Sequence, residues 1–263
     1  MRKPLLALAL SMGVLGSGAH AAERIAVLTS DVAEIVVALG AANEVVARDR
    51  ASRMRELAHA SEIGFMRSLS AETIAGSRPT LAIGSSAAQP PTLWPQLRAV
   101  GVRAEQVALA EDGSDFAQAI RRVGTLIDKR AAADALARDW QAKMAPRKPT
   151  ARRYLVSYDG AMVAGRGTPA DTLIAAAGGV NAAAGIQGYK VLSREAWRTL
   201  APDVIVLAAH NAPVHGGAAA FARRPEIAAT AAGRSGKVVE MSARDAMMVT
   251  LDSPAVVDRL RRL

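Results

Sequence analysis

Short apolar runs alternate with helix-like segments along most of the chain. An apolar run at residues 24–28 is followed by a helical pattern over residues 32–39, which Gly40 ends. Further along, a helical pattern over residues 70–75 is followed by an apolar run at residues 80–83. Strands that alternate with helices in this way are typical of parallel sheets, so the pattern predicts an α/β fold.

The middle of the chain replaces this alternation with one long helical pattern. The pattern continues without Gly or Pro after Gly124 until the segment 145–149, which is rich in helix breakers. It predicts a single linking helix over residues 115–148. Such a rigid helix would hold two α/β lobes, at residues 22–114 and 149–263, in a nearly fixed relation.

An internal repeat indicates that the two lobes are related. Residues 70–83 align without a gap with residues 193–206. The matching positions include Ser70 and Ser193, Glu72 and Glu195, and Pro79 and Pro202. The repeat predicts either an internal duplication or two independent copies of the same helix-to-strand pattern. Two lobes that face each other form a cleft, which is a common place for a ligand.

The first 21 residues have the features of a secretory signal peptide. Arg2 and Lys3 precede an apolar run over residues 5–15, and an Ala-x-Ala cleavage site ends at Ala21. The run is too short to span a bilayer, and a buried N-terminal helix is the other interpretation. A signal peptide at residues 1–21 predicts a periplasmic mature protein.

The composition narrows the function further. With 51% hydrophobic and 22% charged residues, the 263-residue chain is neither disordered nor collagen-like. It contains no Cys, which excludes disulfide scaffolds, iron–sulfur clusters and thiol catalysis. Its net charge of +9 favours anionic partners. For an exported protein, anionic small molecules or lipid headgroups fit this charge better than nucleic acid does.

The motifs of common hydrolases are missing from the sequence. It contains no G-x-S-x-G elbow, no H-E-x-x-H pair and no Cys nucleophile. No Ser, His and Asp set can be paired by spacing alone. We therefore expect a binding protein rather than an enzyme.

Five segments, taken in order, resemble the haem-binding periplasmic proteins of ABC-type haemin importers. They are residues 64–72, 164–171, 178–182, 188–193 and 201–205. The resemblance covers nearly the whole chain after the signal peptide. It implies two α/β lobes joined by one rigid helix, with haem as the transported ligand and an inner-membrane ABC permease as the partner. The parent group also includes cobalamin- and siderophore-binding proteins, so these ligands are the alternative.

The resemblance also points to a ligand site, with one departure. In the family a Tyr in the motif Gly-Tyr-Met-Arg typically holds the haem iron, but here that position is Phe65. A phenyl ring has no lone pair for iron, so Phe65 either forms an apolar wall for the porphyrin or packs in the core. Arg67 retains the family's Arg, which either binds a haem propionate or forms a surface ion pair.

The iron ligand must then come from another residue. Tyr158 is the first candidate, because it follows the first predicted strand of the second half, where cleft-facing loops begin. His210 and His59 are further candidates, in a loop after a strand and in a polar loop before Gly64, respectively. The alternatives are a buried Tyr with a satisfied hydroxyl, exposed loop histidines, and a zinc site formed by His210 and His215.

The Gly-rich segment at residues 165–171 allows three interpretations. Thr168 can cap a helix, with Asp171 completing a capping box. The helix start can also receive a haem propionate, helped by Arg166. The spacing G-x-G-x-x-A allows a dinucleotide site, although this signal is weak alone.

Two further pairs follow from the resemblance. Tyr189 and Lys190 lie in a segment that resembles a family loop at the cleft edge, where they either contact the ligand or form a surface turn. Glu72 and Glu195 each follow a predicted cap, where acidic residues interact favourably with the helix dipole. The resemblance implies that each also docks in an arginine pocket of the permease.

Overall fold

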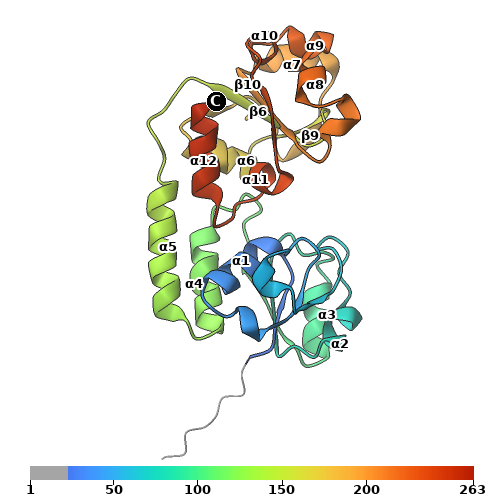
Figure 1. Cartoon of the computed structure of the whole chain (residues 1–263), viewed down its shortest axis with the longest axis vertical. Helices are drawn as coiled ribbons and strands as arrows, with labels where there is room; N and C mark the ends of the chain where they lie inside the picture. Colours follow the sequence, from blue (N-terminus) through green and yellow to red (C-terminus); the bar gives the residue numbers. More distant parts are fainter. Residues whose placement is uncertain (1–22) are drawn as a thin grey trace, which may run out of the picture.

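The structure, a computed structural model, describes residues 23–263, and the predicted signal peptide lies outside this range. It contains two lobes, each built on its own sheet (Figure 1). This arrangement confirms the α/β, two-lobe prediction. Within the described residues, no helix is long and apolar enough to cross a membrane.

The first lobe contains a five-stranded sheet in the order β3-β2-β1-β4-β5. All neighbouring strands are parallel. The strands are β1 (Ile25–Val27), β2 (Val45–Arg48), β3 (Ser61–Glu62), β4 (Leu81–Ser85) and β5 (Arg103–Ala108). The connections contain α1 (Ser30–Ala38), η1 (Ala42–Glu44), η2 (Arg55–Leu57), α2 (Ala71–Gly76) and α3 (Leu93–Ala99). Every residue of β1 and β4 is buried, as expected for parallel strands covered on both faces.

The second lobe contains a mixed sheet in the order β11-β10-β6-β7-β9, with β8 also paired to β6. The strands are β6 (Arg153–Ser157), β7 (Met162–Ala164), β8 (Val180–Asn181), β9 (Tyr189–Val191), β10 (Val204–Ala208) and β11 (Val238–Met241). The helices are α6 (Pro169–Ala176), α7 (Arg194–Leu200), η3 (Ala212–His215), α8 (Ala218–Ala222), α9 (Pro225–Ala228), α10 (Ala231–Arg234), α11 (Ala243–Met247) and α12 (Ser253–Arg262). Strands β6, β8, β10 and β11 pair in parallel, whereas β7 and β9 are antiparallel.

The prediction of one continuous helix over residues 115–148 is wrong. The segment forms two helices, α4 (Phe116–Leu126) and α5 (Arg130–Met144), which run side by side as a hairpin (Figure 1). Asp128 ends the first helix with a left-handed φ of 56°, a conformation that Asp tolerates better than most residues. Gly124 lets the two helices approach closely, because a Cβ there would lie 2.1 Å from the Ala133 Cβ.

The predicted repeat recurs in the geometry of both lobes. Ser70 caps α2 by accepting a hydrogen bond from the Thr73 backbone at 3.5 Å, and Ser193 caps α7 in the same way through Ala196 at 3.4 Å. After these helices, Arg78 and Ala201 occupy matching positions of the alignment. Both have left-handed backbones, with φ of 50° and 44°. The buried strands β4 and β10 follow.

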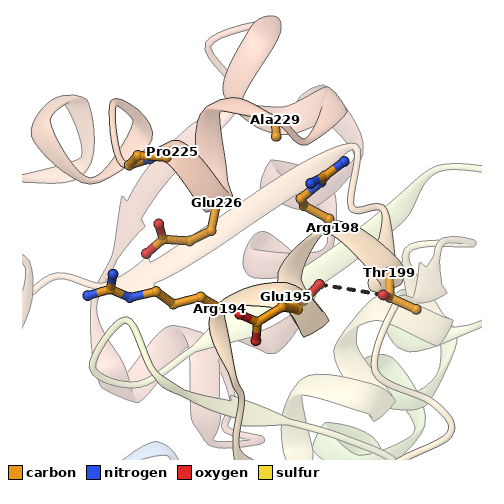
Figure 2. Close-up of a pocket in the computed structure, with 7 residues that line it drawn as sticks. All are labelled: Arg194, Glu195, Arg198, Thr199, Pro225, Glu226 and Ala229. Atoms are coloured by element: carbon orange, nitrogen blue, oxygen red, sulfur yellow. Dashed lines mark hydrogen bonds between the residues drawn. The ribbon is translucent and has the colours of Figure 1, made fainter.

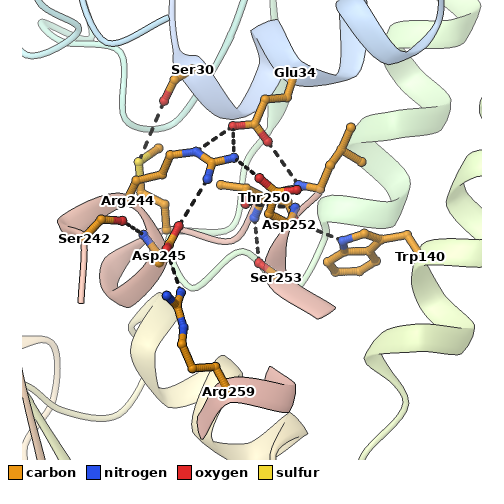
Figure 3. A network of polar contacts seen from close by, with 12 residues as sticks. Ser30, Glu34, Trp140, Ser242, Arg244, Asp245, Thr250, Asp252, Ser253 and Arg259 are labelled. Carbon is orange, nitrogen blue, oxygen red and sulfur yellow. Dashed lines mark hydrogen bonds and ion pairs between the residues drawn. The ribbon is translucent and has the colours of Figure 1, made fainter. Parts of the chain in front are cut away.

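An ion-pair network joins the lobes next to the helical hairpin (Figure 3). Arg244 of α11 donates to Glu34 of α1 at 2.8 Å and to Asp252 at 2.8 Å. The Leu251 backbone also donates to Glu34 at 3.3 Å. The Glu34 side chain is only 11% exposed, and burial raises its pKa while Arg244 opposes that rise. Trp140 of α5 donates to the Thr250 carbonyl at 2.9 Å, which fixes the same loop to the hairpin.

Candidate functional site

Tyr158 and His210 lie together at the carboxyl ends of two paired strands. Tyr158 follows β6 and His210 follows β10, and these strands are parallel neighbours. Their ring centroids are 5.0 Å apart with an edge-to-face angle of 64°. The Asn211 amide donates to the Tyr158 carbonyl at 2.9 Å and fixes the two loops to each other. Two residues predicted separately as iron ligands therefore form one aromatic pair.

The polar tips of this pair are accessible. The Tyr158 side chain is not buried in the core, since the residue is 37% exposed, and His210 is exposed. Among residues 23–263, neither the Tyr158 hydroxyl nor the His210 imidazole has a hydrogen-bond partner. The interpretation of Tyr158 as a buried residue with a satisfied hydroxyl is therefore wrong. Both groups are free to bind a ligand.

Phe65 and Arg67 occupy the corresponding end of the first-lobe sheet. They follow β3 after Gly64, whose φ of 102° turns the chain away from the sheet. The Gln89 backbone donates to the Met66 carbonyl at 2.7 Å and holds this loop against the loop after β4. Phe65 is 40% exposed, which contradicts the interpretation that it packs in the core. Arg67 is also exposed, and it makes no ion pair within the described chain.

Electrostatics links Arg67 to Tyr189 of the other lobe. Burial raises the pKa of the Tyr189 hydroxyl, the positive charge of Arg67 opposes this rise, and the negative charge of Glu111 adds to it. The Tyr189 side chain is nevertheless partly accessible, since the residue is 43% exposed. Lys190 is exposed on the same edge strand, but consecutive strand residues point to opposite faces. Only one of this pair can face Arg67.

Thr168 and Arg166 do not form an open anion site. The Thr168 hydroxyl is buried, donates to the Gly165 carbonyl at 2.7 Å and accepts from the Asp171 backbone at 3.4 Å. Asp171 in turn accepts from the Gly167 backbone at 3.2 Å. These contacts form the helix cap, so the prediction that Thr168 contacts the ligand is wrong, and nothing in this geometry favours a dinucleotide. Arg166 is exposed and lies 3.4 Å from the Gln187 side chain.

His59 lies at the wrong end of its sheet to join the site. Its Nε2 is 3.0 Å from the carbonyl of Val45, the first residue of β2. Because the strands are parallel, His59 lies at their amino ends, whereas Phe65 lies beyond their carboxyl ends. The prediction of His59 as an iron ligand therefore does not fit the structure. His215 is also engaged, since its Nε2 lies 2.6 Å from the Asp159 carbonyl.

Glu72 and Glu195 are exposed in the first turns of α2 and α7. Figure 1 shows these helices in different lobes, towards opposite ends of the molecule. The pKa of the Glu195 carboxyl is lowered by its own backbone N–H and by Ser193, as expected at a helix start. Both carboxylates are available to a partner.

Sequence reasoning did not identify two features of the cleft edge. Asp31 and Asp49 are buried carboxylates that follow β1 and β2, and burial raises the pKa of each. Leu109 and Val214 are exposed apolar residues that follow β5 and β10. All four residues lie after strands of the two sheets, in the segments that follow their carboxyl ends. No group of three or more possible metal ligands occurs among residues 23–263, so the histidines after β10 do not form a zinc site with acidic residues.

Two separate hollows flank this region. One, of about 420 Å³, lies between the lobes beside the Glu34–Arg244 pair and also includes Ser30, Arg53 and Met54. A larger one, of about 740 Å³, lies between α7 and α9 on the second lobe, and its lining residues do not include Tyr158 (Figure 2). The predicted iron ligands Tyr158 and His210 lie at the strand ends, and neither lines this larger hollow.

The chain belongs to the periplasmic binding protein family, whose model matches residues 25–244. Membership of a family of transport receptors agrees with the expectation that the chain is not an enzyme. No curated protein sequence matches the chain.

Solved structures of haem-binding proteins have the same fold. The apo periplasmic heme-binding protein RhuT from Roseiflexus sp. RS-1 is 32% identical, with a TM-score of 0.83 over 92% of this chain and 97% of that one. The periplasmic heme-binding protein BhuT, solved with two hemes, is 31% identical, with a TM-score of 0.82 over 91% and 97%. HutB of Vibrio cholerae is 27% identical, with a TM-score of 0.80 over 92% and 98%.

Proposed function

We propose that this chain binds haem in the periplasm and delivers it to an ABC importer of the inner membrane. The observation that carries this proposal is the accessible Tyr158–His210 pair, in a fold shared with heme-binding proteins at 31% and 32% identity. The exposed Phe65 ring and the Arg67 guanidinium, at the corresponding end of the other sheet, add support.

The properties of haem match these side chains. Haem is a flat, largely apolar ring with two propionates and an iron that accepts oxygen or nitrogen ligands. Phe65 would stack on the ring, and Arg67 would bind a propionate. Tyr158 would ligate ferric iron as a phenolate, with His210 as the other candidate in the same pair. Tyr189, which is 43% exposed on β9, would contact the ligand from the second lobe.

Export and docking complete the proposal. Residues 1–21 would direct the chain to the periplasm and be removed. Glu72 and Glu195, exposed on separate lobes, would dock on arginines of the permease. Haem would then leave the receptor at the mouth of the permease without any reaction catalysed by this chain.

Titration with haemin tests the proposal directly. We expect the purified chain without residues 1–21 to shift the Soret band to that of coordinated ferric haem, with saturable binding. Serum albumin depleted of haem serves as a positive control, and the heat-unfolded chain as a negative one. Binding of cobalamin or a ferric siderophore with no Soret shift by haemin would contradict haem as the ligand.

A further inference from the structure

The groove between α7 and α9 carries charges of both signs (Figure 2). It has a volume of about 740 Å³, and Arg194, Glu195, Arg198 and Glu226 project from its walls. A second hollow of about 300 Å³ shares Arg194 and Glu226 and adds Arg224. The two hollows therefore form one charged surface, which we call the α7–α9 groove.

The arginines of the α7–α9 groove have no acidic partner within the described chain. Arg194 and Arg198 are four residues apart on α7, so their like charges lie on one face of the helix. No ion pair within 4.0 Å involves them, although Glu195 and Glu226 line the same groove. Arg224 instead places its guanidinium 5.1 Å from the centre of the Phe221 ring. Arg122 of the first half, by contrast, pairs with Asp115 at 3.2 Å.

The repeat shows that the fold does not require these arginines. In the alignment of α2 with α7, Glu72 corresponds to Glu195, but Ala71 and Ala75 stand in the places of Arg194 and Arg198. Both helices form and are capped in the same way. The extra positive charges therefore belong to the surface of the second lobe and not to the construction of the helix.

We propose that the α7–α9 groove binds an acidic loop of the permease, beside the arginine that receives Glu195. The inference rests on the proposed function and refines it. The guanidinium groups of Arg194 and Arg198 bind carboxylates on the partner, while Glu195 and Glu226 bind its arginines. Because the first lobe offers only Glu72 at the equivalent place, the two lobes are not interchangeable on the importer. The receptor consequently docks in one preferred orientation.

Charge reversal tests the groove against a matched control. The test variant is Arg194→Glu/Arg198→Glu, and the control is Arg130→Glu/Arg138→Glu on α5, where both arginines are exposed and have no ion pair within residues 23–263. Binding is measured to the haem importer of the source organism in phosphatidylcholine nanodiscs. We expect the test variant to bind about tenfold more weakly and the control to bind within about twofold of the unmodified chain.

A compensating change makes the test specific. Acidic residues in the periplasmic loops of the permease are changed singly to Arg, and one such change should restore binding of the test variant. Equal losses in the test variant and the control, or no loss in either, would overturn the proposal. So would an absence of importer binding by the unmodified chain, or recovery by no permease change. A loss seen only with anionic-lipid nanodiscs would assign the groove to the membrane instead.

The outcome is separable from that of the proposed function. Haemin titration of the test variant should give the same Soret shift and affinity as the unmodified chain, because Arg194 and Arg198 are not among the residues proposed to contact haem. If the unmodified chain does not bind haemin, the proposed function fails, while importer binding can still be measured on the ligand-free chain. If the test variant binds haemin normally and binds the importer as tightly as the unmodified chain does, only the groove proposal fails.

Discussion

The two lobes repeat one scaffold but place different side chains at its functional edge. The first lobe has Phe65 and Arg67 after β3 and buries two carboxylates, Asp31 and Asp49, after β1 and β2. The second lobe presents a phenol and an imidazole. Its buried polar side chains in residues 149–263 are all neutral: Ser157, Thr168, Asn181, Thr230, Thr250 and Ser253. Capped helices and central strands recur in both lobes. The repeated elements therefore form the scaffold, and the loops after the strands carry the side chains that differ between the lobes.

Removing the phenol of the second lobe should have the largest effect. In Tyr158→Phe we expect haemin affinity to fall about tenfold or more, with loss of any phenolate band, because the ring keeps its shape but loses its oxygen. His210→Ala is the matched comparison, and it should retain the band. A Tyr158→Phe spectrum that equals that of the unmodified chain would eliminate Tyr158 and leave His210 as the candidate ligand.

Transferring the phenol to the first lobe sharpens the comparison. Phe65→Tyr should produce a phenolate-type ferric spectrum, because Phe65 is exposed after β3 and Tyr adds an oxygen to the same ring. Phe65→Leu, which adds no donor, is the control. If both variants have the spectrum of the unmodified chain, the loop after β3 does not reach the iron.

The joint between the lobes should be sensitive to one added methyl group. Gly124→Ala places a Cβ 2.1 Å from that of Ala133, so the helices α4 and α5 must separate. We expect a loss of about 1–3 kcal/mol in the free energy of unfolding, measured by urea denaturation. Gly76→Ala in α2 meets no atom within 4 Å and should not destabilise the chain. Equal stability of both variants would show that the hairpin is looser than described.

The buried acids should give the first lobe a pH dependence. Burial raises the pKa of Asp31, so the folded state holds this proton more tightly than the unfolded state. Its contribution to stability is present below the usual pKa of 3.8 and is lost as the pH rises through the folded-state pKa. Asp31→Asn should therefore be more stable relative to the unmodified chain at about pH 8 than at about pH 4, which lies close to the unfolded-state pKa.

A matched substitution controls for changes in net charge. Glu56→Gln removes one exposed carboxylate from the same lobe and should show no such difference between the two pH values. A stability difference for Asp31→Asn that stays constant with pH, measured by urea unfolding, would contradict the raised pKa.

The helix caps should give the smallest and most equal effects. Ser70→Ala and Ser193→Ala each remove one cap hydrogen bond, at 3.5 Å and 3.4 Å, and each should cost about 0.5–1 kcal/mol. The effects should add in the double variant, because the sites lie in separate lobes. Clearly unequal losses, measured by thermal unfolding, would show that the two copies of the repeat are not energetically equivalent.

Local patterns predicted the scaffold because its signals are local. The caps at Ser70 and Ser193 and the buried runs of β4 and β10 could be identified within a few residues of sequence. The break between α4 and α5 could not, because Asp128 is neither Gly nor Pro and the fold is stabilised by the distant contact of Gly124 with Ala133.

The candidate site was only partly predictable for a similar reason. Tyr158 follows the buried strand β6, a position that indicated a loop facing the ligand, whereas Phe65 was identified only through the family motif that it resembles. Thr168 and His59 have side chains that suit a ligand, but their own backbone neighbours occupy them at Gly165 and Val45. Sequence shows which groups a residue carries, whereas only the fold shows whether those groups are already bonded.

The Glu34–Arg244 contact has a mechanical consequence for cargo release. Glu34 accepts from both the Arg244 guanidinium and the Leu251 backbone, so swinging the lobes apart at this side would break both contacts at once. The two lobes are therefore held together at one side by these contacts and do not open there without breaking them. A bound ligand would therefore leave on the side opposite to the Glu34–Arg244 contact. A partner bound to both lobes would supply the free energy needed to widen that side.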